Sequence, residues 1–194
     1  MEHRIDKQRL LDTVALWNRF LKKKVRLVAC GGTALTLLDI KSSTKDVDFL
    51  VPIETEYDYL LGMLKDLGYT PKSGNGWGKA GDPFIFDLYP GKRIHTTELL
   101  DSPLDEGRHI SLKEYPYVKI SILNFYDLII SKLFRASSVD FEDTIMLYRA
   151  KNNEIDLNKL EERFKETAGY DIAQERMLTH WDTFKKKLKQ EKLA

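Results

Sequence analysis

Two acidic residues, Asp46 and Asp48, flank Val47 at the start of a short apolar segment that ends at Pro52. The segment has the composition of a strand, and successive side chains of a strand point to opposite faces. The two carboxylates are therefore expected on one face, while Val47 and Phe49 supply the buried face. Paired carboxylates suit hard divalent cations such as Mg²⁺ or Mn²⁺. The pair predicts a metal site at the start of this strand.

Two glycines, Gly31 and Gly32, precede the first of these acids, with Gly32 fourteen residues before it. They follow the apolar, β-branched run 25–29, and residues 33–38 have helical composition. Glycine lets the backbone turn sharply and approach a ligand, and free N–H groups at a helix start attract anions. Gly31, Gly32 and Thr33 are therefore expected to cradle the phosphates of a nucleoside triphosphate.

A third acid, Asp87, stands in the middle of the apolar run 84–89. An unpaired carboxylate is costly to bury. Asp87 is therefore expected either to pair with a basic side chain or to join Asp46 and Asp48 around a metal ion.

The pattern Gly31-Gly32-Thr33-Ala34-Leu35, followed by Thr44-x-Asp46-Val47-Asp48-Phe49, resembles nucleotidyltransferases of the DNA polymerase β superfamily. It is most similar to the small prokaryotic branch that includes the toxins of AbiE-type toxin–antitoxin systems. The resemblance covers roughly residues 25–147. It implies a mixed sheet with helices, a glycine turn that holds the triphosphate, and three acids that hold two metal ions. An acid on a later strand completes such sites, and the resemblance gives that role to Asp87.

The resemblance also implies that Thr44 and Lys45 contact the nucleotide. Members of the family often have a basic residue two positions before this threonine, where the present chain has Ser42. Either Lys41 or Lys45 is therefore expected to take the role of that basic residue.

The segment Ser131-Lys132-Leu133-Phe134-Arg135, followed by Asp140-x-x-Asp143, resembles a second sequence element of the same branch. The resemblance implies that Lys132 reaches a substrate phosphate, as lysine often does. A local alternative is that Asp140 caps a helix and Asp143 favours the positive end of that helix.

The whole chain has 194 residues, 42% of them apolar, and a formal net charge of +1. These values predict a globular protein without a general field that attracts nucleic acid. The single cysteine, Cys30, excludes an internal disulfide and is expected to be buried. No long apolar run is present, so neither a signal peptide nor a membrane span is expected, and a cytoplasmic location follows.

The elements that must position these residues follow from periodicity and turn signals. The sequence predicts helices over residues 6–23, 54–67, 156–167 and 172–189 and from Asn124 onward, and strands over 25–29 and 84–89, near Ile94 and over 117–120. Recurring glycines between Tyr69 and Pro83 favour a hairpin, with a base-stacking role for Trp77 as the alternative. The expected fold class is α+β, a nucleotidyltransferase-like mixed β-sheet flanked by helices, with a catalytic core over residues 1–122 and a C-terminal helical subdomain over 123–194.

The expected activity is transfer of a nucleoside monophosphate from a triphosphate to an acceptor hydroxyl by two metal ions. The resemblance makes tRNA the first candidate acceptor, a protein side chain or small molecule the others, and an antitoxin protein a candidate partner. The alternative is a non-catalytic nucleotide-binding or regulatory protein with the same fold. The presence of all three acids favours the enzyme.

Overall fold

The computed structural model describes residues 4–82 and 84–193. Pro83, at the end of the predicted hairpin, and the terminal residues 1–3 and 194 lie outside the described residues. The chain divides into two compact units. Unit 1 comprises residues 1–93 and 101–123, and unit 2 comprises residues 94–100 and 124–194.

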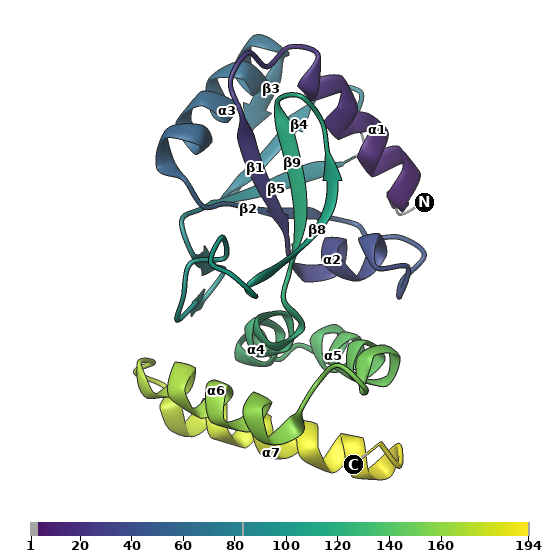
Figure 1. The fold of residues 1–194 in the computed structure, drawn as a ribbon, viewed down its shortest axis with the longest axis vertical. Coiled ribbons are helices and arrows are strands. Elements are labelled where there is room, and N and C mark those ends of the chain that lie inside the picture. Colours follow the sequence, from purple (N-terminus) through teal and green to yellow (C-terminus); the bar gives the residue numbers. More distant parts are fainter. Residues whose placement is uncertain (1–3, 83, 194) are drawn as a thin grey trace. The chain divides into compact units, whose positions relative to one another are not determined.

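Unit 1 is built on a mixed sheet, in which the described residues form seven strands (Figure 1). The strand order is β3-β4-β5-β2-β1-β9-β8. The bounds are β1 Val25–Ala29, β2 Val47–Val51, β3 Tyr69–Pro71, β4 Gly76–Lys79, β5 Ile85–Pro90, β8 His109–Glu114 and β9 Val118–Leu123. Strand β1 is parallel to β9 and β2 is parallel to β5, whereas β1 and β2 are antiparallel. This arrangement confirms the predicted α+β class.

The helices of unit 1 are α1 Lys7–Asn18, α2 Gly31–Leu37 and α3 Glu54–Asp66. Trp17 of α1 packs against Phe86, with ring centroids 4.7 Å apart, and Lys65 of α3 lies over the ring of Trp77. Since Trp77 and Phe86 are register partners, both helices contact the same face of the sheet. Trp77 is buried there, which gives it a role in the core. The opposite face carries Asp48 and is called the Asp48 face below.

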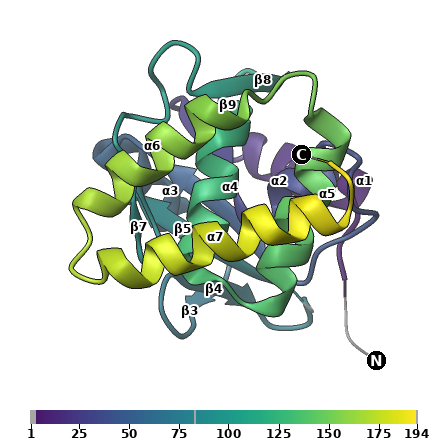
Figure 2. The ribbon, with the colours of Figure 1, turned by 90° about the horizontal axis from the view of Figure 1, so that it is seen from below.

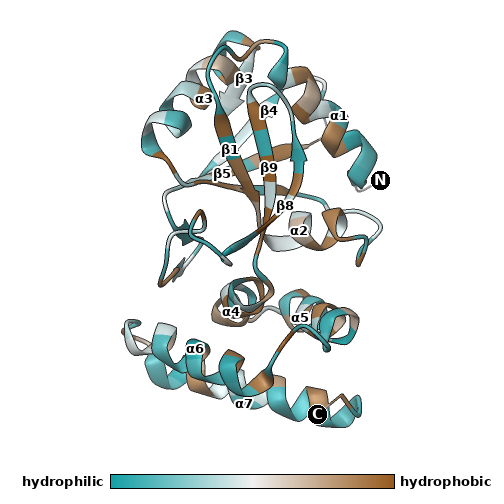
Figure 3. Ribbon diagram, in the orientation of Figure 1, coloured by the Kyte–Doolittle hydropathy of each residue, from teal (hydrophilic) through white to brown (hydrophobic). Residues whose placement is uncertain are grey.

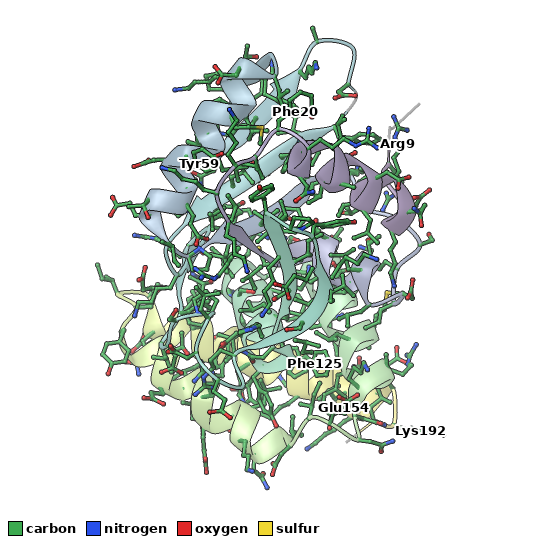
Figure 4. All side chains as sticks on the ribbon, turned by 45° about the horizontal axis from the view of Figure 1, so that its top comes forward. Arg9, Phe20, Tyr59, Phe125, Glu154 and Lys192 are labelled. Atoms are coloured by element: carbon green, nitrogen blue, oxygen red, sulfur yellow. The ribbon has the colours of Figure 1, made fainter. Side chains whose placement is uncertain are left out.

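Helix α1 ends before the predicted limit of residue 23. The backbone N–H groups of Arg19 and Phe20 donate to Leu16 and Trp17 in a final tight turn, which leaves Phe20 51% exposed (Figure 4). The next segment is held by α3, because the backbone N–H of Lys22 donates to the hydroxyl of Tyr59 at 2.7 Å. The predicted continuation of the helix is therefore wrong.

Strand β8 was not expected from the sequence. It lies at the edge of the sheet, most of its side chains are exposed, and its register shifts between Ser111 and Lys113. An exposed edge strand with a bulge lacks the apolar alternation by which strands are identified.

Unit 2 contains four helices among its described residues, α4 Phe125–Arg135, α5 Ser138–Lys151, α6 Leu157–Gly169 and α7 Gln174–Gln190, and the short strand β7 Thr97–Glu98. Strand β6, Arg93–Ile94, pairs with β7 and begins at the last residue before unit 2. Helices α6 and α7 lie side by side (Figure 2) and carry isolated hydrophobic residues among hydrophilic ones (Figure 3). The rings of Phe164 and Trp181 stack with centroids 5.1 Å apart. The apolar stripes predicted for these two helices therefore form a core.

The first turn of α5 differs from its prediction. Ser137 is the N-cap, and its side chain accepts from the backbone N–H of Asp140. Asp140 is the third helical residue and completes a capping box. The prediction that Asp140 itself caps the helix is wrong, because the extended backbone before the helix is at Ser137. No described helix is long and apolar enough to cross a membrane.

Candidate active site

Asp48 and Asp87 lie side by side in the sheet of unit 1. They are register partners in the adjacent parallel strands β2 and β5. Register partners project on the same face, so both carboxylates belong to the Asp48 face. Asp48 is 7% exposed and Asp87 is half-buried. Two acids 39 residues apart in the sequence therefore meet on one sheet face.

Asp46 lies one residue before β2 and is exposed. Burial raises the pKa of Asp87, and the negative charge of Asp46 raises it further. The charged form of Asp87 is thus disfavoured where no cation balances the neighbouring acids. All three predicted acids therefore lie at or beside the first residues of β2.

The chemistry of these donors fits a hard divalent cation, because all of them are carboxylate oxygens. Within the described ranges, no three His, Cys, Asp or Glu side chains already form a group that could hold a metal ion. Asp46, Asp48 and Asp87 supply carboxylate donors at one end of β2, and Asp46 is the exposed one of the three. The donor types fit Mg²⁺ or Mn²⁺.

Gly31 makes room for the carboxylate of Asp48. It is the first residue of α2, its φ angle is +56°, and a Cβ at this position would overlap Asp48 Oδ2. A Cβ on the next residue, Gly32, would come 2.6 Å from Thr44 Oγ1. Both glycines therefore allow Thr44 and the start of β2 to pack closely against α2.

Two threonine hydroxyls fix the backbone of the paired acids. Thr33 Oγ1 and Thr44 Oγ1 both donate to the carbonyl oxygen of Asp46, at 3.2 and 3.0 Å. Thr33 Oγ1 also accepts from the backbone N–H of Asp48 at 2.9 Å. Thr44 is anchored in turn by two backbone hydrogen bonds with Ile5. This positioning of Asp46 and Asp48 is a role that the sequence analysis did not assign to either threonine, and Lys45 beside them is exposed.

Gly76 is a further residue of the site that the sequence analysis missed. It is the register partner of Asp87 across β4 and β5. A Cβ on Gly76 would lie 3.3 Å from Asp87 Oδ1 and 2.9 Å from Ile85 Cγ2. The recurrence of glycine around Trp77 was the only signal, and it indicated a hairpin rather than space beside a carboxylate.

Lys132 lies in unit 2 and is only 2% exposed. Its ammonium is 2.7 Å from Asp143 Oδ2 and 3.6 Å from Asp140 Oδ1. Asp140 also accepts hydrogen bonds from Arg135 and Ser137. These contacts balance the charge of Lys132 within unit 2, and its contact with a nucleotide stays a prediction.

Replacing Gly31 by alanine is expected to destabilise the protein by about 2 kcal/mol or more. A left-handed backbone costs an L-residue roughly 1–2 kcal/mol, and the new methyl group would also displace Asp48. Gly62→Ala is the matched control, since a Cβ at this helical glycine of α3 would meet no atom within 4 Å. The control should gain about 0.5–1 kcal/mol. Urea unfolding measures both, and unchanged stability of Gly31→Ala would contradict the described packing of Asp48.

Comparison with known proteins gives one family and two solved structures. A model of the family described as nucleotidyltransferase of unknown function (DUF6036) matches residues 96–189. The crystal structure of ANT(2″)-Ia in complex with adenylyl-2″-tobramycin aligns with a TM-score of 0.55, at 11% identity, over 82% of this chain and 95% of that chain. A putative nucleotidyltransferase from Thermotoga maritima aligns with a TM-score of 0.46, at 14% identity, over 78% of this chain and 98% of that chain. No curated protein matches the chain.

The alignment with ANT(2″)-Ia covers most of both chains and, at this low identity, shows the fold. The matched family segment follows the three acids in the sequence and contains Lys132, Asp140 and Asp143. The chain therefore has a nucleotidyltransferase fold, as the sequence predicted, and its second half is similar to a nucleotidyltransferase family.

Proposed function

We propose that the protein is a metal-dependent nucleotidyltransferase that transfers a nucleoside monophosphate from a triphosphate to an acceptor hydroxyl. The observation that carries this proposal is the placement of Asp48 and Asp87 as register partners on one face of the sheet. In a nucleotidyltransferase fold, paired carboxylates beside the start of a short helix that begins with two glycines suit metal-assisted phosphoryl chemistry.

Asp46, Asp48 and Asp87 would hold Mg²⁺ or Mn²⁺. When bound, these ions would balance the charge of the triphosphate and favour loss of the proton from the acceptor hydroxyl. Thr33 and Thr44 keep the backbone of the first two acids in place through the carbonyl of Asp46. The main chain at Gly31, Gly32 and Thr33 would face the triphosphate.

Residues outside the acids would add phosphate contacts. Lys45 is exposed directly before Asp46 and would contact the triphosphate. Thr44, 6% exposed, would act mainly through the backbone that it holds. A contact between Lys132 and the nucleotide would compete with the ion pair that Lys132 forms with Asp143.

The leading candidate acceptor is tRNA, in the role of a toxin paired with an antitoxin protein. The support for this role is the motif from Gly31 to Phe49, which resembles the AbiE-type branch. A small hydroxyl compound is the second candidate, because the solved structure of ANT(2″)-Ia holds an adenylylated tobramycin.

A transfer assay tests the proposal. The protein is incubated with each labelled triphosphate, Mg²⁺, and either total tRNA or tobramycin, and covalent label on the acceptor is measured. Transfer that disappears in Asp48→Asn would support the proposal. Binding of a triphosphate without transfer to any acceptor would favour the alternative, a non-catalytic nucleotide-binding protein.

Mg²⁺ and a triphosphate together are expected to raise the melting temperature more than the sum of their separate effects. Each ligand brings charge that the other balances at the acids, and bound ligand stabilises the folded state by mass action. The double variant Asp46→Asn with Asp48→Asn should lose this synergy. Asp58→Asn with Asp66→Asn, two exposed acids of α3, is the matched control and should keep it. Differential scanning fluorimetry gives the comparison, and synergy that survives in the Asp46 and Asp48 variant would remove both residues from the site.

A further inference from the structure

A hollow of about 250 Å³ in unit 1 is lined by Arg26, Leu104, His109, Lys119 and Ser121. Four of the five side chains are polar, and three of these can carry a positive charge. None of the five belongs to the carboxylate site described above. The hollow is called the basic pocket below.

The basic pocket opens on the Asp48 face of the sheet. Val28 pairs with Leu50, and Arg26 and Leu50 share a face with Val28 and Asp48, respectively. Lys119 and Ser121 are the register partners of Arg26 and Val28. The register places Arg26 four residue steps from Asp48 along the strands, which corresponds to about 13 Å. The basic pocket and the acids therefore lie on one face of the sheet, about 13 Å apart along the strands.

Only one of the two cations of the basic pocket, Arg26, has a carboxylate partner among the residues that the structure describes. Arg26 Nη1 lies 2.6 Å from Glu56 Oε1, and the other oxygen of Glu56 accepts from the backbone N–H of Arg26 at 2.8 Å. Lys119 is directly opposite Arg26 and forms no ion pair with any residue in the described ranges. Like charges side by side on adjacent strands oppose folding. Glu114, the register partner of Lys119 on β8, pairs with Lys24 at 3.7 Å, so Lys119 keeps a positive charge that an anion would balance.

His109 adds an unused hydrogen-bonding atom. Its Nδ1 is buried and has no hydrogen-bond partner in the described part of the chain. A buried polar atom without a partner costs about 1–3 kcal/mol, so such atoms usually indicate a missing ligand or water. The hydroxyl of Ser121, two residues from Lys119 on the same strand, supplies another donor. Ammonium, guanidinium, imidazole and hydroxyl donors together match a tetrahedral oxyanion.

We propose that the basic pocket binds a phosphate group of the acceptor substrate, an inference that rests on the proposed nucleotidyl transfer. The reacting triphosphate must lie at Asp48 and Asp87, and the separation of about 13 Å places the basic pocket beyond its phosphates. The acceptor is therefore a phosphorylated molecule, and a cationic acceptor would be repelled by Lys119. The phosphate belongs either to an RNA backbone or to a small phosphorylated compound.

Inorganic phosphate is the probe for the basic pocket itself. Titration into ¹⁵N-labelled full-length protein should give saturable shifts of the backbone amides of Lys119 and Ser121, and the apparent affinity should fall at least fivefold in Lys119→Gln. The matched control is Lys113→Gln, because Lys113 is exposed, pairs with Ile120 and so belongs to the opposite face. The control should bind phosphate as the wild type does. Absence of saturable shifts, or equal affinity in Lys119→Gln, overturns the pocket whether or not the protein transfers nucleotides.

Transfer kinetics test the link to the acceptor. Lys119→Gln should raise KM for a phosphorylated acceptor at least tenfold and leave KM for the triphosphate unchanged, while Lys113→Gln changes neither. A short RNA and a sugar phosphate are compared, and the acceptor whose KM rises identifies the source of the phosphate. Equal KM of wild type and Lys119→Gln for both acceptors would overturn the assignment to the acceptor. If Asp48→Asn abolishes transfer but binds inorganic phosphate as the wild type does, the phosphate binds at the basic pocket and not at the carboxylate site.

Discussion

Asp87→Asn is expected to lower nucleotidyl transfer by at least about a hundredfold while leaving the metal-free protein as stable as the wild type or more stable. Under the proposed function Asp87 would hold a metal ion, and loss of such a carboxylate removes several kcal/mol of transition-state stabilisation. Asparagine keeps the shape of the side chain, so the sheet should remain intact. Asp66→Asn, at an exposed position of α3, is the control and should leave transfer unchanged.

The expected stability of Asp87→Asn follows from the charges around it. Burial and the charge of Asp46 both raise the pKa of Asp87, so the ionised side chain opposes folding where no cation is bound. Its neutralisation should add about 0.5–2 kcal/mol to the free energy of unfolding, as expected for a functional site. The rival interpretation, an Asp87 held by a basic partner, forecasts a loss of about 3 kcal/mol. Thermal unfolding in chelator decides, and clear destabilisation would overturn the three-acid site.

Asp140→Asn is expected to destabilise the protein by about 3 kcal/mol. This loss does not depend on whether the protein transfers nucleotides. Asp140 is fully buried, and its Oδ2 accepts from Arg135 Nε and Ser137 Oγ, both at 2.7 Å. Lys132, also buried, lies 3.6 Å from its other oxygen. Removal of one member of a buried charge cluster costs about 3–5 kcal/mol because the remaining charges lose their balance. Urea unfolding measures the loss, and Glu142→Gln, an exposed acid of the same helix, is the control.

The contribution of Asp140 to the free energy of unfolding should also depend on pH. Burial raises the pKa of Asp140, but hydrogen bonds from Arg135 and Ser137 and the charges of Arg135 and Lys132 outweigh this effect and lower the pKa to about 2. Because the folded pKa lies below the unfolded value of 3.8, the stabilisation is complete above pH 3.8 and is lost as the pH falls toward 2. The amount lost is about 2 kcal/mol. The gap in stability between wild type and Asp140→Asn should narrow over this interval, and a constant gap would contradict the described contacts.

Local sequence signals were sufficient for the elements that do not depend on distant partners. The apolar run at residues 25–29 forms strand β1, and the apolar side chains of α6 and α7 recur at helical spacing, as the sequence predicted. Asn124 caps α4 at the residue from which the sequence predicted a helix. Side-chain spacing and helix capping act within a few residues, so the sequence alone determined them. It also supplied the two acids before and within β2 and the α+β class.

The tertiary structure alone decided which distant residues meet. The pairing of β2 with β5 brings Asp87 beside Asp48, and the pairing of β1 with β9 brings Lys119 beside Arg26. The space beside Gly76 and the edge strand β8 likewise depend on strand register. Strand pairing joins segments far apart in the chain through backbone groups that every residue has, so side-chain patterns do not encode the partner. For the same reason, only the packing of α5 against α4 shows that Lys132 is balanced by Asp143.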